Sequence, residues 1–228
     1  MMALSVIRWK AACHKFGARP NWRGIHMAAP LAILVGMVCA AAIYLHFAAA
    51  ALPDISLNSP AGMATLSGAW AKGEVVVLVR HAERCDRSAA PCVDTFDGIT
   101  VGGKALAVAL GAAFTRFGIE RTDILTSPLT RTRQTASYMF GSAVPELAWL
   151  ANCKAVQLDD IGRAKAAGRN LILVTHSNCI EKIQKDLGMA VAEPPYGGML
   201  FMTFDDRQRL PVATGTLAAE RFIAGAAP

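Results

Sequence analysis

Four apolar runs along the chain have the length and composition of β-strands. The runs "EVVVLV" (74–79) and "NLILVT" (170–175) contain no alternating polar positions, which predicts strands covered on both faces. "DILTS" (123–127) and "GGMLFMTF" (197–204) predict two further strands.

Segments with helical patterns separate these strands. Helices are predicted over about 100–118, 128–140, 158–167 and 179–188, and Pro128 would occupy the first turn of the second one, where proline is favoured. Strands that alternate with helices indicate parallel pairing and helices on both faces of one sheet. The sequence therefore predicts an α/β fold, a three-layer sandwich with a mostly parallel central sheet, over residues 72–228.

The first 52 residues have a different character. A basic segment without acidic residues (1–26) precedes an apolar run (27–52) that is long enough to cross a bilayer as a helix. The positive-inside rule places the basic segment in the cytoplasm and the rest of the chain across the membrane. Small residues in "FAAAALPD" would also suit a signal peptidase, so a transmembrane anchor, which the length of the run favours, and a cleaved signal peptide both stay open. Residues 53–71 are predicted to be a linker that passes into a short amphipathic segment.

The net charge of +6 comes from this leader. Of the 23 basic residues five precede the apolar run, which leaves 18 against 17 acidic residues in the remainder. A nearly neutral domain gives no support to nucleic-acid binding.

Four cysteines follow the leader and allow three pairings. We favour Cys85 with Cys92, which closes a short loop, and Cys153 with Cys179, which joins two later segments. Such bridges persist in an oxidising compartment, in agreement with export. The chain has no CxxC pair, and His176 with Cys179 is a poor metal site, so no metal is expected.

Polar and charged side chains follow three of the predicted strands. Arg80 and His81 end the first strand, Ser127 and Arg131 follow the second, and His176 ends the late strand. The carboxyl ends of parallel strands share one edge, where ligands normally bind. Arginine matches phosphate oxygens, a neutral histidine can attack phosphorus to form phosphohistidine, and a second histidine can stabilise the transferring charge. The pattern predicts a phosphoryl-transfer site.

Four segments, "LVRHAER", "DGITVGGKAL", "TSPLTRTRQTA" and "LILVTHSN", resemble in this order the landmarks of the histidine phosphatase superfamily, which includes phosphoglycerate mutases and acid phosphatases. The resemblance covers roughly residues 74–204. It implies a phosphoglycerate mutase-like fold and a metal-independent phosphomonoesterase that needs no cofactor.

Within this superfamily, "RHAERCDRS" with a second cysteine soon after, the exported topology and Cys179 behind the late histidine are similar to the phosphatases of heptose(II) phosphate in the lipopolysaccharide core. That similarity implies a phosphorylated sugar of the lipopolysaccharide core, or another phosphomonoester, as the partner. It also implies a periplasmic location, either anchored in the inner membrane or released after signal cleavage.

The resemblance assigns roles to individual residues. It makes His81 the nucleophile and His176 the second catalytic histidine. It makes Arg80, Arg84 and Arg131 ligands of the phosphoryl group. A surface salt bridge with a neighbouring acidic residue is the alternative for Arg84.

The sequence departs from the superfamily pattern at two places. Ala82 replaces the glycine that usually follows the nucleophilic histidine, and Ser177 stands where acid phosphatases have an aspartate that protonates the leaving group. The general acid is therefore open, with Glu146 favoured and Glu83 or Asp97 as alternatives.

Other readings also stay open. The chain could act on a different sugar phosphate or on protein phosphohistidine, or it could be a phosphate-binding module without turnover. The proline- and glycine-rich segment around Tyr196 is predicted to be a plain connector, in preference to a loop over the site.

Overall fold

The computed structural model describes residues 36–37, 57, 59–141, 143–204 and 211–225. The chain divides into two units, Met1–Leu52 and Pro53–Pro228. In the first unit, Gly36 and Met37 are described, and both are helical. The predicted basic segment and the rest of the predicted anchor or signal segment lie outside the described residues. No helix in the described ranges has both the length and the apolarity needed to cross a bilayer.

A five-stranded sheet forms the centre of the second unit, in the order β2-β3-β1-β4-β5. The strands are β1 (Val75–Arg80), β2 (Thr122–Thr126), β3 (Asn170–Thr175), β4 (Met199–Thr203) and β5 (Val212–Leu217). β1 and β2 both pair parallel with β3, whereas β4 pairs antiparallel with β1 and with β5. The sheet is thus mixed: β1, β2, β3 and β5 run in one direction, in agreement with the prediction of a mostly parallel sheet, and β4 runs in the opposite direction.

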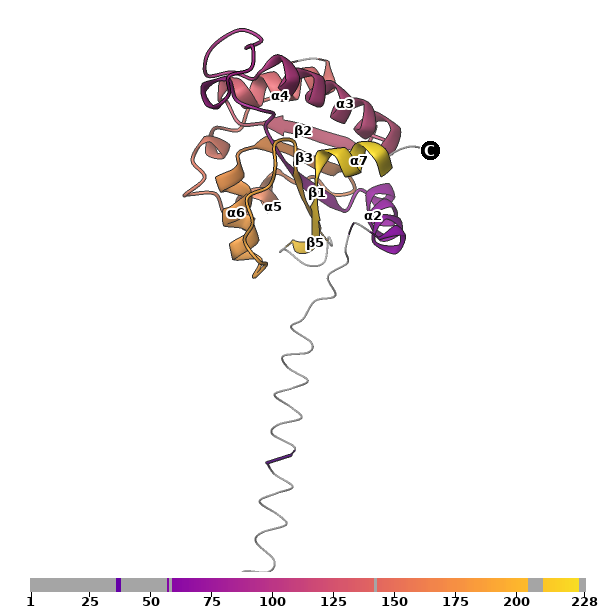
Figure 1. The fold of residues 1–228 in the computed structure, drawn as a ribbon. Helices are drawn as coiled ribbons and strands as arrows, with labels where there is room; N and C mark the ends of the chain where they lie inside the picture. The colour runs from indigo at the N-terminus through magenta and orange to yellow at the C-terminus, as the bar shows by residue number, and fades with distance from the viewer. Residues whose placement is uncertain (1–35, 38–56, 58, 142, 205–210, 226–228) are drawn as a thin grey trace, which may run out of the picture. The chain divides into compact units, whose positions relative to one another are not determined.

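Helices cover both faces of the sheet (Figure 1). They are α2 (Pro60–Lys72), α3 (Val101–Phe117), α4 (Thr130–Phe140), α5 (Leu158–Ala164), α6 (Ser177–Asp186) and α7 (Ala219–Gly225), with 3₁₀ turns η2 (Cys85–Arg87) and η3 (Ala148–Ala151). Alternate residues of β1 belong to two separate cores: Val77 is in the core that includes residues of α2, α3, α4 and α7, and Leu78 is in the core that includes residues of α5 and α6. Because successive strand residues point to opposite faces, this apolar run needs helices on both sides.

Helix α2 occupies most of the segment that was predicted to be a linker. Its first turn has a proline, and the Ser59 hydroxyl accepts a hydrogen bond from Gly62 N, a typical N-cap. Gly73 ends the helix in the left-handed conformation (φ 74°), which glycine adopts without steric cost. Leu66 and Trp70 are buried in the core, so α2 is part of the folded domain.

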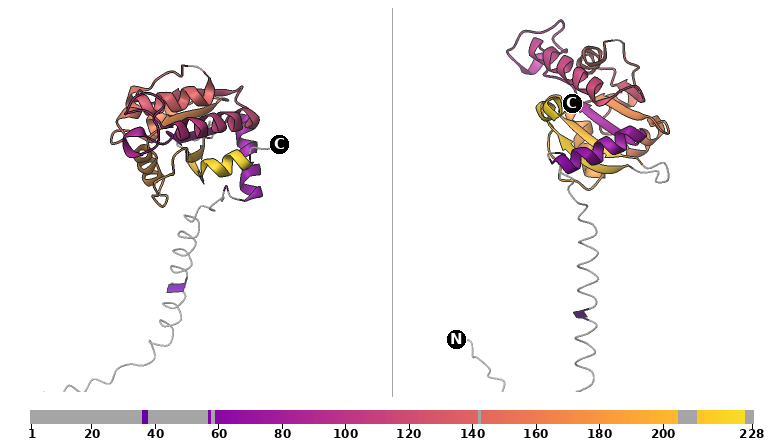
Figure 2. Two further views of the ribbon diagram at one scale, coloured as in Figure 1. Left: turned by 45° about the horizontal axis from the view of Figure 1, so that its top comes forward. Right: turned by 90° about the vertical axis from the view of Figure 1, so that its right-hand side faces the viewer.

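Helices α3 and α4 lie side by side on one face (Figures 1 and 2). A Cβ atom on Gly111 would lie 1.8 Å from the Met139 carbonyl oxygen, so a side chain there would force the two helices apart. Helix α4 begins at Thr130, two residues later than predicted, because Pro128 and Leu129 belong to the loop after β2. The first turn of α4 carries Arg131.

Candidate active site

The carboxyl ends of β1, β2 and β3 meet at one pocket. The register pairs Arg80 with Thr175, and the His81 amide donates a hydrogen bond to the Thr175 carbonyl oxygen at 2.9 Å. A pocket of about 270 Å³ opens here, lined by Arg80, His81, Arg84, Arg87, Arg131, His176, Ser177, Asn178 and Glu193. The structure therefore brings together all five residues that the sequence nominated.

His81 lies on the floor of this pocket and is 3% exposed. Its Nδ1 atom is 2.8 Å from the Ala82 carbonyl oxygen. A carbonyl can only accept, so Nδ1 carries the hydrogen and Nε2 carries the lone pair. Nε2 lies 3.2 Å from Arg131 Nε. Burial lowers the pKa of His81 to about 3, and His176, Arg131 and Arg80 add repulsion, so the imidazole is neutral and nucleophilic at neutral pH.

His176 faces His81 across the pocket, with ring centroids 5.4 Å apart. Its Nε2 atom is 2.9 Å from the Ser127 hydroxyl, whereas its buried Nδ1 atom has no hydrogen-bond partner. If the hydroxyl donates to Nε2, Nδ1 carries the hydrogen. Burial, followed by repulsion from Arg131 and Arg84, lowers the pKa of His176 to about 4. A free N–H group in a buried pocket is suited to an anionic oxygen.

Arg80 is tied to the loop that precedes β4. Its side chain is 13% exposed, its Nη1 atom lies 3.0 Å from Glu193 Oε1, and its guanidinium stacks on the Tyr196 ring at 4.2 Å. The buried Nε atom has no partner, so Arg80 retains one donor for a ligand. The Tyr196 ring centroid is 5.9 Å from that of His81. The loop predicted to be a plain connector therefore forms one side of the pocket.

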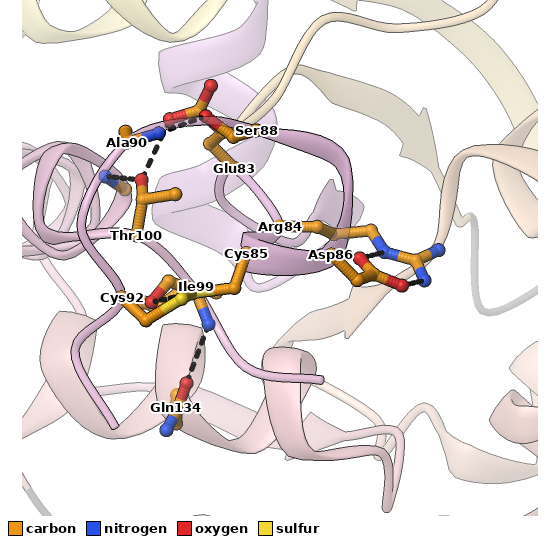
Figure 3. The surroundings of a disulfide bond; sticks show 11 residues. Glu83, Arg84, Cys85, Asp86, Ser88, Ala90, Cys92, Ile99, Thr100 and Gln134 are labelled. Carbon is orange, nitrogen blue, oxygen red and sulfur yellow. Dashed lines mark hydrogen bonds and ion pairs between the residues drawn. A yellow bond between two sulfur atoms is a disulfide. The ribbon is translucent and has the colours of Figure 1, made fainter. Parts of the chain in front are cut away.

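Arg131 and Arg84 differ in how their charge is balanced. Arg131 is half-buried, and its pKa is lowered by burial first and then by repulsion from Arg84. Arg84 instead donates from Nε and Nη2 to both carboxylate oxygens of Asp86 (Figure 3), and this hydrogen bonding raises its pKa. The salt bridge considered as the alternative for Arg84 is present, although Arg84 still lines the pocket.

Both favoured disulfides are present in the structure. Cys85 and Cys92 are bonded directly behind the site, with Cα atoms 5.5 Å apart (Figure 3). Cys153 and Cys179 are bonded with Cα atoms 4.4 Å apart and lie in the core between the sheet and α6. The pairing prediction is confirmed, and the first bridge holds η2, the turn that carries Arg87.

The carboxylates nominated as general acid do not line the pocket. Glu146 lies 3.8 Å from Arg133, Glu83 accepts a hydrogen bond from Thr100, and Asp97 accepts one from Thr130. Among the described residues, the carboxylate that lines the pocket is Glu193, which was not predicted from the sequence.

Six residues in or beside the pocket were not predicted as site residues: Arg87, Ser177, Asn178 and Glu193 line it, Ser127 is the partner of His176, and Tyr196 lies beside His81. Ser127 and Tyr196 lie in segments that the sequence had already marked, since Ser127 follows a predicted strand and Tyr196 lies in a proline- and glycine-rich loop. The described residues contain no group of three or more His, Cys, Asp or Glu side chains that could hold a metal ion. The prediction of a metal-free reaction stays a prediction that a chelator can test.

Comparison with known proteins adds sequence relatives and a fold neighbour. No family model matches the chain. The chain is 37% identical over 134 residues to "Lipopolysaccharide core heptose(II)-phosphate phosphatase" of Escherichia coli O9:H4 (strain HS), a match that covers 56% of this chain and 65% of that protein. The protein of the same name from E. coli strain K12 is 36% identical over 126 residues, covering 54% and 62%. The chain thus spans slightly less than two thirds of these curated relatives.

Among solved structures, the protein histidine phosphatase SixA complexed with tungstate superposes with a TM-score of 0.51 at 16% identity, covering 64% of this chain and 97% of that chain. This likeness shows the fold. In sequence the chain is similar to the heptose(II)-phosphate phosphatases, and in fold it is similar to SixA. The sequence comparison therefore confirms the predicted resemblance to the heptose(II)-phosphate phosphatases of the lipopolysaccharide core.

Proposed function

We propose that this chain is a phosphomonoesterase that works through a phosphohistidine intermediate on His81. One observation carries the proposal: a buried neutral imidazole, fixed through Nδ1 by the Ala82 carbonyl, turns its Nε2 lone pair toward Arg131 in a pocket lined by arginines. Of the four arginines that line the pocket, Arg80 and Arg84 are paired with carboxylates, whereas the charge of Arg131 lies close to that of Arg84 and would be balanced by a bound anion. A phosphoryl group meets that requirement and also has an atom that a neutral imidazole can attack.

In the proposed reaction the phosphoryl group enters between His81 and the guanidinium groups. Nε2 of His81 attacks phosphorus while the bond to the leaving oxygen breaks. Arg131, the free Nε of Arg80 and Nδ1–H of His176 donate to the phosphoryl oxygens, where charge builds up in the transition state. Water then attacks the phosphohistidine and releases inorganic phosphate.

Phosphate release from p-nitrophenyl phosphate tests the proposed activity. The assay uses the full chain purified in detergent, with EDTA present. We expect turnover by the unaltered protein and none by His81→Ala, while Glu146→Gln serves as a matched control outside the pocket. Phosphate binding without turnover would favour the non-catalytic module, and loss of activity with EDTA would contradict a metal-free reaction.

We propose heptose phosphate in the lipopolysaccharide core as the substrate. Support comes from the sequence relatives, which are named lipopolysaccharide core heptose(II)-phosphate phosphatases. Mass spectrometry of core oligosaccharide from cells with and without the protein tests this, and we expect more phosphate on heptose when the protein is absent. An unchanged phosphate count would leave another sugar phosphate, or protein phosphohistidine, as the substrate.

We also propose that the catalytic unit lies in the periplasm, anchored in the inner membrane or released from it. The basic segment before the long apolar run and the two disulfides support this location. Protease added to intact spheroplasts should degrade the catalytic unit if it is anchored. A protected unit in the spheroplast interior would contradict the proposal.

A further inference from the structure

The proposed reaction needs a proton for the leaving oxygen. An alkoxide is a poor leaving group, and a positioned acid that protonates it accelerates such reactions by about 10²–10⁴-fold. The residue after the late histidine is Ser177, which has no ionisable proton near neutral pH. The donor must therefore come from another part of the pocket.

Four carboxylates near the site are already engaged elsewhere. Asp86 accepts two hydrogen bonds from Arg84, and these bonds lower its pKa, so it remains deprotonated. Glu83 and Asp97 accept from threonine hydroxyls, and Glu146 lies beside Arg133 on the outside of the pocket. None of the four is among the pocket-lining residues.

Glu193 is the one carboxylate, among the residues that the structure describes, that lines the pocket. It lies in the loop between α6 and β4, and Arg80 holds that loop. Arg80 Nη1 donates to the Pro194 carbonyl oxygen, and the Arg80 amide and carbonyl bond to Gly198 O at 2.9 Å and Gly197 N at 3.2 Å. The carboxylate is therefore positioned by both the backbone and the side chain of the residue before the nucleophile.

The depth of the two groups in the pocket matches an in-line displacement. His81 is 3% exposed on the floor, whereas the Glu193 side chain is 62% exposed at the mouth. In phosphoryl transfer the attacking and leaving atoms lie roughly in line with phosphorus. A nucleophile on the floor therefore directs the leaving oxygen toward the open side, where Glu193 lies.

We infer that Glu193 is the proton donor to the leaving group; this inference rests on the proposed function. As Nε2 of His81 bonds to phosphorus, the electron pair of the breaking P–O bond goes to the leaving oxygen, which takes the proton of the Glu193 carboxyl group. In the second half, the Glu193 carboxylate takes a proton from the water that attacks phosphohistidine. The P–N electron pair returns to His81, so the cycle closes with one alcohol and one phosphate formed.

A bound substrate also changes the partner of Glu193. A phosphate at Arg80 competes with Glu193 for the guanidinium group, which releases the carboxyl group to turn toward the leaving oxygen.

A comparison of leaving groups tests the inference. Glu193→Gln keeps the size of the side chain and removes the acid, and kcat/KM is measured with phenyl phosphate, whose phenolate is strongly basic, and with p-nitrophenyl phosphate, whose phenolate is weakly basic. We expect kcat/KM to fall by about 10²-fold or more with phenyl phosphate. With p-nitrophenyl phosphate we expect the fold-decrease to be less than about one tenth as large. Glu146→Gln, the control outside the pocket, should leave both values unchanged.

Three outcomes separate the possibilities. Equal losses with both substrates would mean that Glu193 only positions Arg80, and unchanged values would mean that it has no role; either result overturns the inference. Both results leave the proposed function intact if the unaltered protein turns over and His81→Ala does not. Absence of turnover by the unaltered protein would instead overturn the proposed function.

Discussion

The two ends of the central sheet differ in what they hold. At the amino ends of β2 and β3 lies a cavity of about 540 Å³, lined in part by Met63, Trp70 and Phe117, and at the carboxyl ends lies the pocket of about 270 Å³ around His81. The larger cavity lies where α2 packs against the rest of the domain. The smaller one holds two histidines with strongly lowered pKa values. The arginine charges and the lowered histidine pKa values therefore mark the proposed active site, whereas cavity volume does not.

Hydrogen bonds at the amino end serve the fold. Trp70 Nε1 donates to the Gly118 carbonyl oxygen, and the Asn170 side chain accepts from Val75 N at 3.1 Å and donates to Trp70 O at 2.9 Å. Buried polar atoms without partners occur at both ends: Thr122 Oγ1 at the amino end of β2, and Arg80 Nε and His176 Nδ1 at the carboxyl end, where the unpaired atoms belong to a cation and an imidazole. Unpaired buried nitrogen atoms of a cation and an imidazole that line one pocket are the groups that an anionic ligand would satisfy.

After the loss of His81 itself, removal of the Arg131 guanidinium group should have the largest effect at the carboxyl end. Arg131→Gln deletes the positive charge beside His81 Nε2, and we expect kcat/KM for p-nitrophenyl phosphate to fall by about 10²–10³-fold. Arg133→Gln, on the exposed side of the same helix, is the matched control and should stay within about twofold. A similar loss in both variants would mean that the helix, and not the site, had been damaged.

The pH dependence of stability tests whether the two histidines at the carboxyl end are buried in their neutral form. His81 and His176 have folded-state pKa values of about 3 and about 4, below the unfolded value of about 6.5. The unfolded chain therefore binds more protons in this window, so their contribution to stability is complete above about pH 6.5 and is lost as the pH falls toward 3. Urea unfolding between pH 7 and pH 4 should show this decline.

Substitution of His176 by Gln should make that decline shallower, because one of the two buried titrations is removed. An unchanged slope would mean that the histidine is not buried in its neutral form.

The Cys85–Cys92 bridge should have a smaller effect on catalysis. It supports the turn η2 with Arg87, but the site also has contacts from four other elements. For Cys92→Ser we expect KM for p-nitrophenyl phosphate to rise by about threefold to tenfold, by analogy with the loss of one exposed charge-assisted contact, with kcat nearly unchanged. A loss of kcat equal to that of Arg131→Gln would show that the loop positions the reacting groups themselves.

Trp70→Ala should have the smallest effect on turnover and a large effect on stability. Removal of this 6%-exposed ring should lower the free energy of unfolding by about 3–5 kcal/mol. The kcat/KM of the folded fraction should stay within about twofold. A loss of more than tenfold at full folding would mean that the amino end takes part in function, contrary to the contrast between the two ends.

The sequence was sufficient for the elements with strong patterns. The apolar runs of β1 and β3 need cover on both faces, and residues that end such strands meet at one edge, so the convergence of Arg80, His81 and His176 could be predicted. The direction of β4 could not, because an apolar run has the same composition in parallel and antiparallel pairing. β5 was missed because its pattern is weak: it is an edge strand, interrupted by Gly215 and partly exposed.

The site itself was predictable only where a residue adjoined a strong strand or matched a known motif. Glu193 and Tyr196 lie in a loop without helix or strand, and the backbone and side-chain contacts of Arg80 bring this loop to the pocket. No periodic pattern in the sequence predicts that this loop contacts Arg80. Arg84 shows the reverse case, since the motif nominated it but its pairing with Asp86 depends on the turn η2.

The central claim is that His81 becomes phosphorylated. Its most direct test is rapid acid-free quenching of the full chain during turnover of p-nitrophenyl phosphate, followed by mass spectrometry of the peptide that contains His81. The account predicts a phosphoryl group on His81 that is stable in base, is lost in acid, and is absent from His81→Ala. Turnover without any phosphorylated intermediate, or with the phosphoryl group on another residue, would contradict it.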